Sequence, residues 1–268
     1  MEKQIDYAIL RAYNNKAYDP KNPPDVANLI SKIDPVVKKI IVVVNGPQDG
    51  ANTPEFLRST FPTQSKEGKI ETIVLENYGW SKALNEGLRA SMPKSDYETR
   101  LMISNEVNPT QEQLMEMHEK VLKGNAISSV VYGLFNTGSY ALFEGRDEPT
   151  CLVPRNTCTL WRSDVMKGFA FNEKLDSQMG MEDVYMGLQI YAKTKLLPVL
   201  GPTNVKWAVR QGVNSQEKHN KERETIRNYL PQFRDDTLNA YFNALSVIAL
   251  SKGKGNGMPL FRAIKSYE

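Results

Sequence analysis

Apolar and polar positions along this chain follow a repeating order of strand, polar loop and helix. Short apolar runs, typical of strands, are separated by segments whose apolar residues recur three and four positions apart, as on one face of a helix. Four strands are predicted in the first half of the chain, at Tyr7–Leu10, Lys39–Val44, Ile70–Leu75 and Thr99–Ser104. Lys39–Val44 is almost continuously β-branched, which favours a strand buried on both faces of a parallel sheet.

A helix is predicted after each of these strands. The first helix begins at Asp25, and the other three cover Pro54–Thr60, Lys82–Ser91 and Gln111–Lys123. The first should bury Val26, Leu29, Ile30 and Ile33. The last should be N-capped by Thr110, and its side chains that point toward the core should be Leu114, Met117, Val121 and Leu122. The alternation predicts an α/β fold with a mostly parallel, doubly wound central sheet flanked by helices.

The second half of the chain has a less regular pattern. Strands are predicted at Ile127–Leu134, Ser139–Glu144, Asn156–Trp161, Leu196–Leu200 and Val205–Val209. A short helix follows Ser163, and another begins near Glu182 with Val184, Leu188 and Tyr191 on one apolar face. From residue 213 the pattern is polar and helical. We therefore expect one domain over residues 1–212 and a C-terminal helical extension over 213–268, packed on the domain or on a partner subunit.

Composition excludes several classes of protein. The 268 residues carry a net charge of only +3, which argues against a nucleic-acid surface based on bulk charge. No apolar run approaches the roughly 18–20 residues that span a bilayer, and the first residues lack the plan of a signal peptide. The two cysteines, Cys151 and Cys158, fit no zinc or redox spacing. These features predict a cytoplasmic protein without a transmembrane segment or a nucleic-acid partner, in which Cys158 is buried and inert.

Polar residues gather where the predicted strands end. In doubly wound parallel sheets, ligands bind outside the carboxyl ends of the strands. Two adjacent carboxylates, Glu182 and Asp183, lie at the predicted start of a later helix. They are open to two interpretations: acids that the helix dipole stabilises, or a general base held on a rigid element beside a cleft.

Five stretches of the chain carry motifs in a recognisable order. They are ILRAYN at 9–14, VVVNGPQDG at 42–50, ENYGWSKALNEG at 76–87, MISNEVNP at 102–109, and FAFNE at 169–173 followed by Glu182 and Asp183. In this order they resemble the motifs of family 2 glycosyltransferases, which have the GT-A fold. The resemblance covers roughly residues 5 to 210, and it implies a nucleotide-sugar donor, usually linked to UDP or GDP.

The resemblance also implies where the donor binds. The nucleoside pocket would be lined by Arg11, Tyr13, Asn45 and Asp49. The diphosphate would lie near Asn77, Gly79 and Lys82, where a helix start supplies free N–H groups and a cation. Tyr13 as an ordinary loop aromatic, and Asn45 with Gly46 as an ordinary tight turn, remain the structural alternatives. We expect Asn85 and Gly87 to serve helix packing.

The metal motif departs from the family. An Asp-x-Asp usually holds the Mg²⁺ or Mn²⁺ that clamps the diphosphate, and here Ser104, Asn105 and Glu106 stand in its place. Glu106 is then the expected metal ligand, and Ser104 and Asn105 are expected to contact the donor. Val44 and Trp207 occupy places where relatives often carry an acid and a metal-binding His. These losses weaken the prediction of a metal-dependent enzyme.

The resemblance assigns the catalytic base to Asp183, with Glu182 orienting it or binding the acceptor. Trp161 and Trp207 would form an apolar wall for a sugar, with a role in the core as the alternative.

Three functions remain to be weighed. The first is an inverting glycosyltransferase with an unknown sugar, lipid-linked or protein acceptor, which self-associates through its C-terminal helices. The second is a degenerate GT-A protein that binds nucleotide-sugar or acts as a scaffold or partner protein. A nucleotidyltransferase would need a Gly-rich basic loop after the first strand, which Arg11–Asn14 is not.

Overall fold

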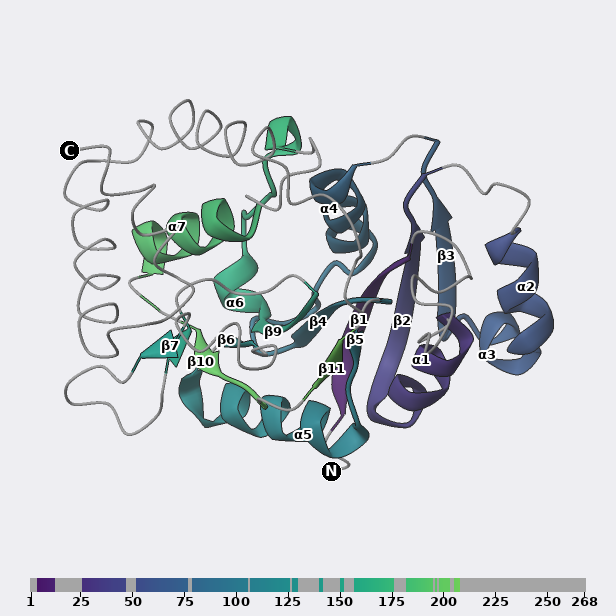
Figure 1. Ribbon diagram of the computed structural model, residues 1–268, viewed down its shortest axis with the longest axis horizontal. Coiled ribbons are helices and arrows are strands. Elements are labelled where there is room, and N and C mark those ends of the chain that lie inside the picture. The colour runs from purple at the N-terminus through teal and green to yellow at the C-terminus, as the bar shows by residue number, and fades with distance from the viewer. Residues whose placement is uncertain are drawn as a thin grey trace.

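The computed structural model describes residues 4–12, 26–46, 52–76, 79–105, 107–125, 127–129, 140–141, 150–151, 157–175, 182–194, 196, 198–202 and 205–207. Within these residues the chain forms a nine-stranded sheet and a separate two-stranded ladder, with helices packed around the large sheet (Figure 1). The C-terminal extension predicted for residues 213–268 lies outside the described residues.

The first four strands form the parallel part of the large sheet. They are β1 (Ile5–Ala12), β2 (Val37–Val44), β3 (Ile70–Val74) and β4 (Thr99–Ser104). Their order is β3-β2-β1-β4, and each neighbouring pair is parallel. All four predicted strands are thus confirmed. The last five residues of β2 are buried, as its β-branched run predicts.

The helices of the first half connect these strands. They are α1 (Val26–Ile33), α2 (Thr53–Thr60), α3 (Pro62–Lys66), α4 (Trp80–Ala90) and α5 (Gln111–Lys120). The four apolar residues predicted to face inward from α1 are buried. Thr110 caps α5 as predicted, because its side chain accepts a hydrogen bond from Gln113 N–H in a capping box.

One side chain predicted to be buried in this region is exposed. Leu114, Met117 and Val121 are buried, but Leu122 is 50% exposed. The prediction for Leu122 is wrong because the regular α-helix ends at Lys120, and the chain continues as a π-helical turn over Val121–Asn125. A π-turn is wider than an α-turn, so the side chains after it no longer follow the 3.6-residue period.

The second half of the chain adds five strands to the sheet, which pair antiparallel except for the parallel pair of β6 with β10. Its strands are β9 (Cys158–Arg162), β6 (Ile127–Ser129), β10 (Val199–Leu200), β8 (Thr150–Cys151) and β7 (Tyr140–Ala141), in that order beyond β4. The strand β9 runs antiparallel to both β4 and β6, which it separates. The large sheet is therefore mixed.

The remaining elements surround this second half. They are the two-stranded ladder β5 (Val107–Asn108) with β11 (Lys206–Trp207), and the helices α6 (Ser163–Met166), η4 (Glu173–Leu175) and α7 (Glu182–Thr194). The helix α7 begins where the sequence predicts. Its described buried side chains include Met186 and Ile190, whereas those of Val184, Leu188 and Tyr191 lie outside the described residues.

Side chains alternate between two cores across the sheet. On one face Leu10, Ile40 and Val42 pack in a core with residues of α1 and α5. On the other face Ile9, Ile41 and Val43 pack with α4, and Met102 packs with α4, α6 and α7. Figure 1 shows α5 below the sheet and α4 and α7 above it. The second face leads to the candidate site.

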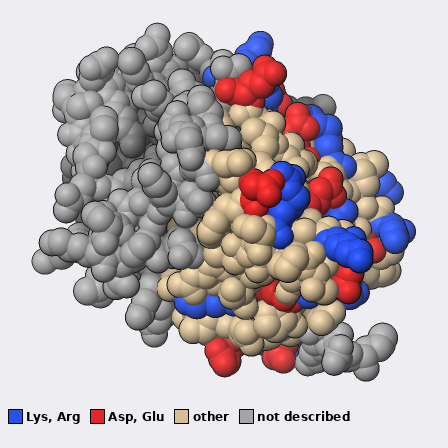
Figure 2. Space-filling view, turned by 90° about the vertical axis from the view of Figure 1, so that its right-hand side faces the viewer, with Lys and Arg blue, Asp and Glu red and all other residues tan. Residues whose placement is uncertain are grey.

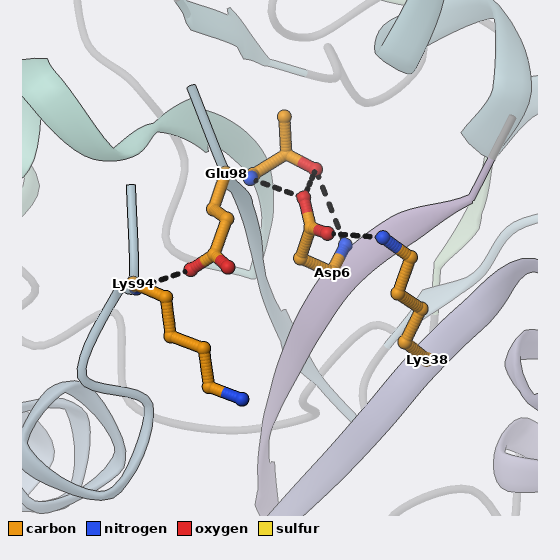
Figure 3. Close-up of polar contacts among 5 residues, drawn as sticks. Asp6, Lys38, Lys94 and Glu98 are labelled. Atoms are coloured by element: carbon orange, nitrogen blue, oxygen red, sulfur yellow. Dashed lines mark hydrogen bonds and ion pairs between the residues drawn. The ribbon is translucent and has the colours of Figure 1, made fainter. Parts of the chain in front are cut away.

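Charged and polar groups satisfy one another where β1, β2 and β4 begin, a region that we call the amino end of the sheet (Asp6, Lys38, Thr99 and Arg100). Thr99 N–H donates to Asp6 Oδ2 at 2.8 Å, and Lys38 Nζ lies 2.7 Å from Asp6 Oδ1 (Figure 3). Arg100 is buried, and its Nε donates to the carbonyl oxygen of Ser91 at 2.9 Å. These contacts join three strands at their first residues.

Charges of both signs are mixed on the face near β3 and α2. Ion pairs there join Lys39 to Glu71 and Lys69 to Asp34, each at 2.7 Å. Figure 2 shows acidic and basic side chains next to each other on this face, without a broad patch of one sign among its described residues. Within the described part of the chain, no helix is both long enough and apolar enough to cross a bilayer.

Candidate functional site

The parallel register brings polar residues together where β1, β2 and β4 end. Arg11 on β1 lies beside Val43 of β2 and Ser104 of β4. The pairing continues past the strands, because Asn45 N–H donates to the carbonyl oxygen of Ala12 at 2.6 Å and Asn105 N–H donates to that of Arg11 at 3.3 Å. We call this region the carboxyl end of the sheet (Arg11, Asn45, Ser104 and Asn105). Each of its four residues is no more than 5% exposed.

Arg11 places a buried positive charge at this end. It is 4% exposed, and its guanidinium carbon lies 3.6 Å from the centroid of the Trp80 ring. A desolvated cation over a tryptophan face gains about 2 kcal/mol or more. Trp80 is the first residue of α4, so this contact joins the end of β1 to the start of that helix. Trp80 was not among the predicted site residues, although it lies in the motif at 76–87, three residues after Asn77.

Asn45 joins β2 to the start of α4. Its Oδ1 accepts a hydrogen bond from Gly79 N–H at 2.9 Å, and Gly79 is the N-cap residue of α4. The Gly79 N–H, expected to meet a diphosphate, is therefore bound by Asn45 in this structure. Gly46 follows with a φ of 109°, a left-handed conformation that glycine adopts without strain, so the tight turn predicted at Asn45 and Gly46 is present. Lys82 lies half-buried in the first turn of α4.

Asn105 has a buried amide that lacks an acceptor. It is 2% exposed, and its Nδ2 has no hydrogen-bond acceptor among the residues that the structure describes. Leaving a buried donor unsatisfied costs about 1–3 kcal/mol, and a ligand that accepted this hydrogen bond would remove the cost. Ser104 beside it is 1% exposed, and its N–H donates to the carbonyl oxygen of Thr157 at 3.0 Å.

The described part of this end offers neutral oxygens to a metal ion. Ser104 Oγ and Asn105 Oδ1 are hard ligands of the kind that Mg²⁺ and Mn²⁺ accept. No group of three His, Cys, Asp or Glu side chains is close enough together to hold a metal among the residues described. The acid of the motif, Glu106, lies outside them. An ion at this place would thus take its protein charge from Glu106.

Several predicted site residues cannot be placed in this geometry. Tyr13, Asp49, Asn77 and Glu106 lie outside the described residues. For three others only the backbone is described, with Glu182 and Asp183 in the first turn of α7 and Trp207 in β11. The predicted helix start at Glu182 is confirmed.

Trp161 lies in the core of the protein. It is 0% exposed on β9 and packs in a cluster that includes Leu84, Met102 and Phe171. This is the alternative that the sequence analysis left open for a tryptophan. In this structure the ring has no exposed face on which a sugar would stack.

Asn85 and Gly87 serve packing, as expected. The Asn85 side chain makes three hydrogen bonds to the segment around Phe171. A Cβ on Gly87 would lie 2.2 Å from the Cγ2 of Ile9, so α4 approaches β1 more closely than any other residue would allow.

Cys158 is a buried thiol on β9. It is 0% exposed, and burial raises its pKa to about 12. A thiol with this pKa stays protonated at neutral pH and is not a nucleophile. The prediction that Cys158 is inert and buried is confirmed.

Two solved structures share this fold. GalNAc-T7 with UDP, GalNAc and Mn²⁺ superposes with a TM-score of 0.64 at 9% identity, over 99% of this chain and 55% of that chain. The mannosyltransferase PcManGT from Pyrobaculum calidifontis, with GDP-Man and Mn²⁺, superposes with a TM-score of 0.55 at 14% identity, over 98% of this chain and 69% of that one. This chain therefore spans little more than half the length of the GalNAc-T7 chain.

The fold is of the GT-A glycosyltransferase type, with a mixed, mostly parallel central sheet flanked by helices. This confirms the predicted fold class. No protein-family model matches the sequence, and no curated protein sequence is similar to it at a significant level.

Proposed function

We propose that this protein is a glycosyltransferase similar to those of family 2. It transfers a sugar from a UDP- or GDP-linked donor to a sugar, lipid-linked or protein acceptor, with inversion at the anomeric carbon. The observation that carries this proposal is the set of four buried polar residues, Arg11, Asn45, Ser104 and Asn105, at the carboxyl ends of three neighbouring strands of a GT-A sheet. Ligands of open α/β sheets bind at this end of the strands.

The first half of the chain would hold the donor. Arg11, Asn45, Tyr13 and Asp49 would surround the nucleoside, and Asn105 Nδ2 would donate its unused N–H to the donor. Lys82, on the first turn of α4, would place its charge near the diphosphate, together with Asn77. Because Asn45 already binds Gly79 N–H, its contribution would be to fix the start of α4 under the ligand.

The second half of the chain would supply the catalytic base. Asp183 lies in the first turn of α7, a helix held by the buried side chains Met186 and Ile190. We assign to Asp183 the removal of the proton from the attacking acceptor hydroxyl, and to Glu182 the orientation of that base or of the acceptor. In an inverting reaction the hydroxyl oxygen bonds to the anomeric carbon as the bond to the nucleoside diphosphate breaks.

A divalent ion would bind through Glu106, with the neutral oxygens of Ser104 and Asn105 nearby. Both structural neighbours were solved with Mn²⁺, and either Mn²⁺ or Mg²⁺ suits this oxygen set. When bound, the ion would supply positive charge that stabilises the departing diphosphate.

A second function is favoured by the loss of the first acid of the metal motif. The uncharged Ser104 stands at that place and is 1% exposed, so its hydroxyl replaces a charged metal ligand with a neutral, buried group. A protein that binds nucleotide-sugar without transferring it, and acts as a scaffold or partner, would keep the fold and lack the base activity of Asp183.

A thermal-shift titration separates these functions. The chain is heated with UDP, GDP and their sugars, each with and without Mn²⁺, because a ligand that binds only the native state raises the melting temperature. The transferase proposal expects one nucleotide class to stabilise the protein, and slow release of free nucleotide from its sugar to be measurable. Binding without any release supports the second function, and the absence of any shift contradicts the transferase proposal.

The variant Asn105→Leu sharpens this test. It removes the unsatisfied amide at nearly constant volume, so the ligand-free protein should be as stable as the wild type or more stable. Nucleotide affinity should fall by roughly tenfold, the value of one hydrogen bond of about 1.4 kcal/mol. The matched control is Asn28→Leu on the exposed side of α1, which should leave nucleotide affinity unchanged.

A further inference from the structure

The side chain of Asn85 connects the two halves of the molecule. Asn85 lies on α4 and is 5% exposed. Its Nδ2 donates to the carbonyl oxygen of Phe171 at 3.0 Å, and its Oδ1 accepts from Phe171 N–H at 2.8 Å. The amide thus pairs with both backbone groups of one residue that is 86 positions away in the sequence.

A third contact adds a charged partner. Asn85 Nδ2 also donates to Glu173 Oε1 at 2.9 Å. Hydrogen bonds to an ionised acceptor are about twice as strong as those between neutral groups. Arg89, one turn further along α4, has a raised pKa chiefly because its guanidinium donates a hydrogen bond to Glu86, and the charge of Glu173 adds a smaller contribution. In the contact between Asn85 and Glu173, the donor lies on α4 and the acceptor is the carboxylate of Glu173.

Phe171 links Asn85 to α7. Its side chain is 3% exposed and packs in one cluster with Met186 and Ile190 of α7 and Leu84 of α4. The rings of Phe169 and Phe171 meet edge to face with centroids 5.1 Å apart, which restricts the Phe171 ring further. A shift of Phe171 would displace the surface on which α7 rests.

We propose that Asn85 is a positioning residue of the transfer site, which fixes α7 relative to α4 through Phe171 and Glu173. This role rests on the proposed function. The helix α4 begins at the carboxyl end of the sheet, where Asn45 and Arg11 contact its first residues. The helix α7 begins with Glu182 and Asp183. Asn85 therefore sets the distance between the donor-binding end of α4 and the acids that begin α7. Transfer depends on that distance, since a displacement of about 1 Å can lower turnover by about a hundredfold.

The variant Asn85→Asp tests this role at constant shape. It replaces the donating NH₂ by an oxygen that faces the carbonyl of Phe171 and the carboxylate of Glu173. The amide of Phe171 should then exchange with deuterium at least about tenfold faster, the loss expected for one or two hydrogen bonds. Release of nucleotide from a UDP- or GDP-sugar should fall by at least about tenfold, while the dissociation constant for the nucleotide stays within about twofold.

A second substitution should partly reverse the defect, because the carboxylate at 85 regains a partner at 173 but still faces the carbonyl oxygen of Phe171. In the double variant Asn85→Asp, Glu173→Gln, the new amide at 173 donates to the carboxylate at 85 and restores a charge-assisted contact in the opposite direction. Glu173→Gln alone keeps an acceptor oxygen for Asn85, so Phe171 exchange should match the wild type. The control Asn28→Asp makes the same chemical change on another helix at an exposed position and should alter none of these measurements.

The outcomes distinguish this role from packing and from the proposed function. If Asn85→Asp lowers the melting temperature but leaves Phe171 exchange and turnover per folded molecule unchanged, the proposal is wrong. If turnover and nucleotide affinity fall together, Asn85 acts on donor binding, which also overturns it. If the wild type binds no nucleotide, the proposed function fails, while the exchange of Phe171 still reports whether Asn85 holds that segment.

A milder variant tests the proposal if Asn85→Asp fails to fold. Glu173→Ala removes one of the three contacts and keeps both bonds between Asn85 and Phe171. In Glu173→Ala, turnover should fall by a smaller factor than in Asn85→Asp, and nucleotide affinity should be unchanged. The double variant Asn85→Asp, Glu173→Gln should also fold. Wild-type turnover in Glu173→Ala, with normal exchange at Phe171, would show that the carboxylate contributes nothing to positioning.

Discussion

The two ends of the parallel sheet use polar residues in opposite ways. At the amino end, Asp6 accepts hydrogen bonds from Thr99 and Lys38, and the Lys38 side chain is 57% exposed. At the carboxyl end, the four polar residues are buried, and Asn105 has a donor without an acceptor among the described residues. The first arrangement is complete without a ligand. The second leaves one donor unpaired among the described residues.

The difference separates stability from function. A network whose members satisfy one another lowers the free energy of the folded chain and requires nothing further. A buried donor without an acceptor raises that free energy, and a ligand that supplied the missing contact would remove this cost. We therefore expect substitutions at the amino end to change stability and those at the carboxyl end to change binding or turnover.

The largest effect should come from Asp183→Asn. The amide keeps the shape and cannot accept the proton, so turnover should fall by about 10²–10⁴-fold, the usual contribution of a general base. Nucleotide affinity and melting temperature should change little. Steady-state release of nucleotide and a binding titration on the same sample measure both quantities, and turnover that survives would remove Asp183 from the mechanism.

Asp6→Ala should have the next largest effect, and only on stability. It leaves the N–H of Thr99 without its acceptor, which should lower the free energy of unfolding by about 1–3 kcal/mol. Urea denaturation measures the loss. Nucleotide affinity of the folded protein should equal that of the wild type, and a parallel loss of affinity would contradict the separation between the two ends.

Glu106→Gln should weaken binding at the carboxyl end by a moderate factor. Loss of the one acid in the metal motif should reduce nucleotide affinity in Mn²⁺ by roughly tenfold and leave affinity in EDTA as it was. Isothermal titration in both buffers gives the comparison. Equal affinities for variant and wild type in Mn²⁺ would show that Glu106 is not a ligand.

Lys38→Met should have the smallest effect. An exposed ion pair contributes about 0–1 kcal/mol, and less at high salt. The hydrogen bond to Asp6 raises the pKa of Lys38 above its ordinary value. The pair's contribution is therefore complete below the ordinary lysine pKa of about 10.4 and is lost as the pH rises through the raised value. The difference in melting temperature between variant and wild type, measured in low salt, should vanish at strongly alkaline pH.

The sequence predicts the parallel half of the sheet well because its signals are local. Lys39–Val44 is continuously β-branched, and Thr110 with Gln113 forms a capping box that depends on four consecutive residues. The insertion of β9 between β4 and β6 was not predicted, because pairing between strands 30 or more residues apart leaves no local signal in either strand. Leu122 was misplaced because a π-turn breaks the helical period.

The site was predictable as a set of positions and not as a set of contacts. The motif order placed Arg11, Asn45, Ser104 and Asn105 at one end of the sheet, where the register confirms that they meet. The stacking of Arg11 on Trp80 and the binding of Gly79 N–H by Asn45 depend on how α4 crosses the sheet. The close contact between Gly87 and Ile9 sets that crossing, and this contact exists only in the folded chain.

The position of β9 also constrains the order in which the strands can pair while the chain is being synthesised. On the ribosome, the four parallel strands emerge first and can pair with one another before the second half of the chain is made, and only the outer edge of β4 then waits for β9. The strand β6 emerges next, but its neighbours in the sheet are β9 and β10, both of which are translated later. Ile127–Ser129 must therefore wait outside the sheet, with its backbone groups unpaired, until Cys158–Arg162 has left the exit tunnel.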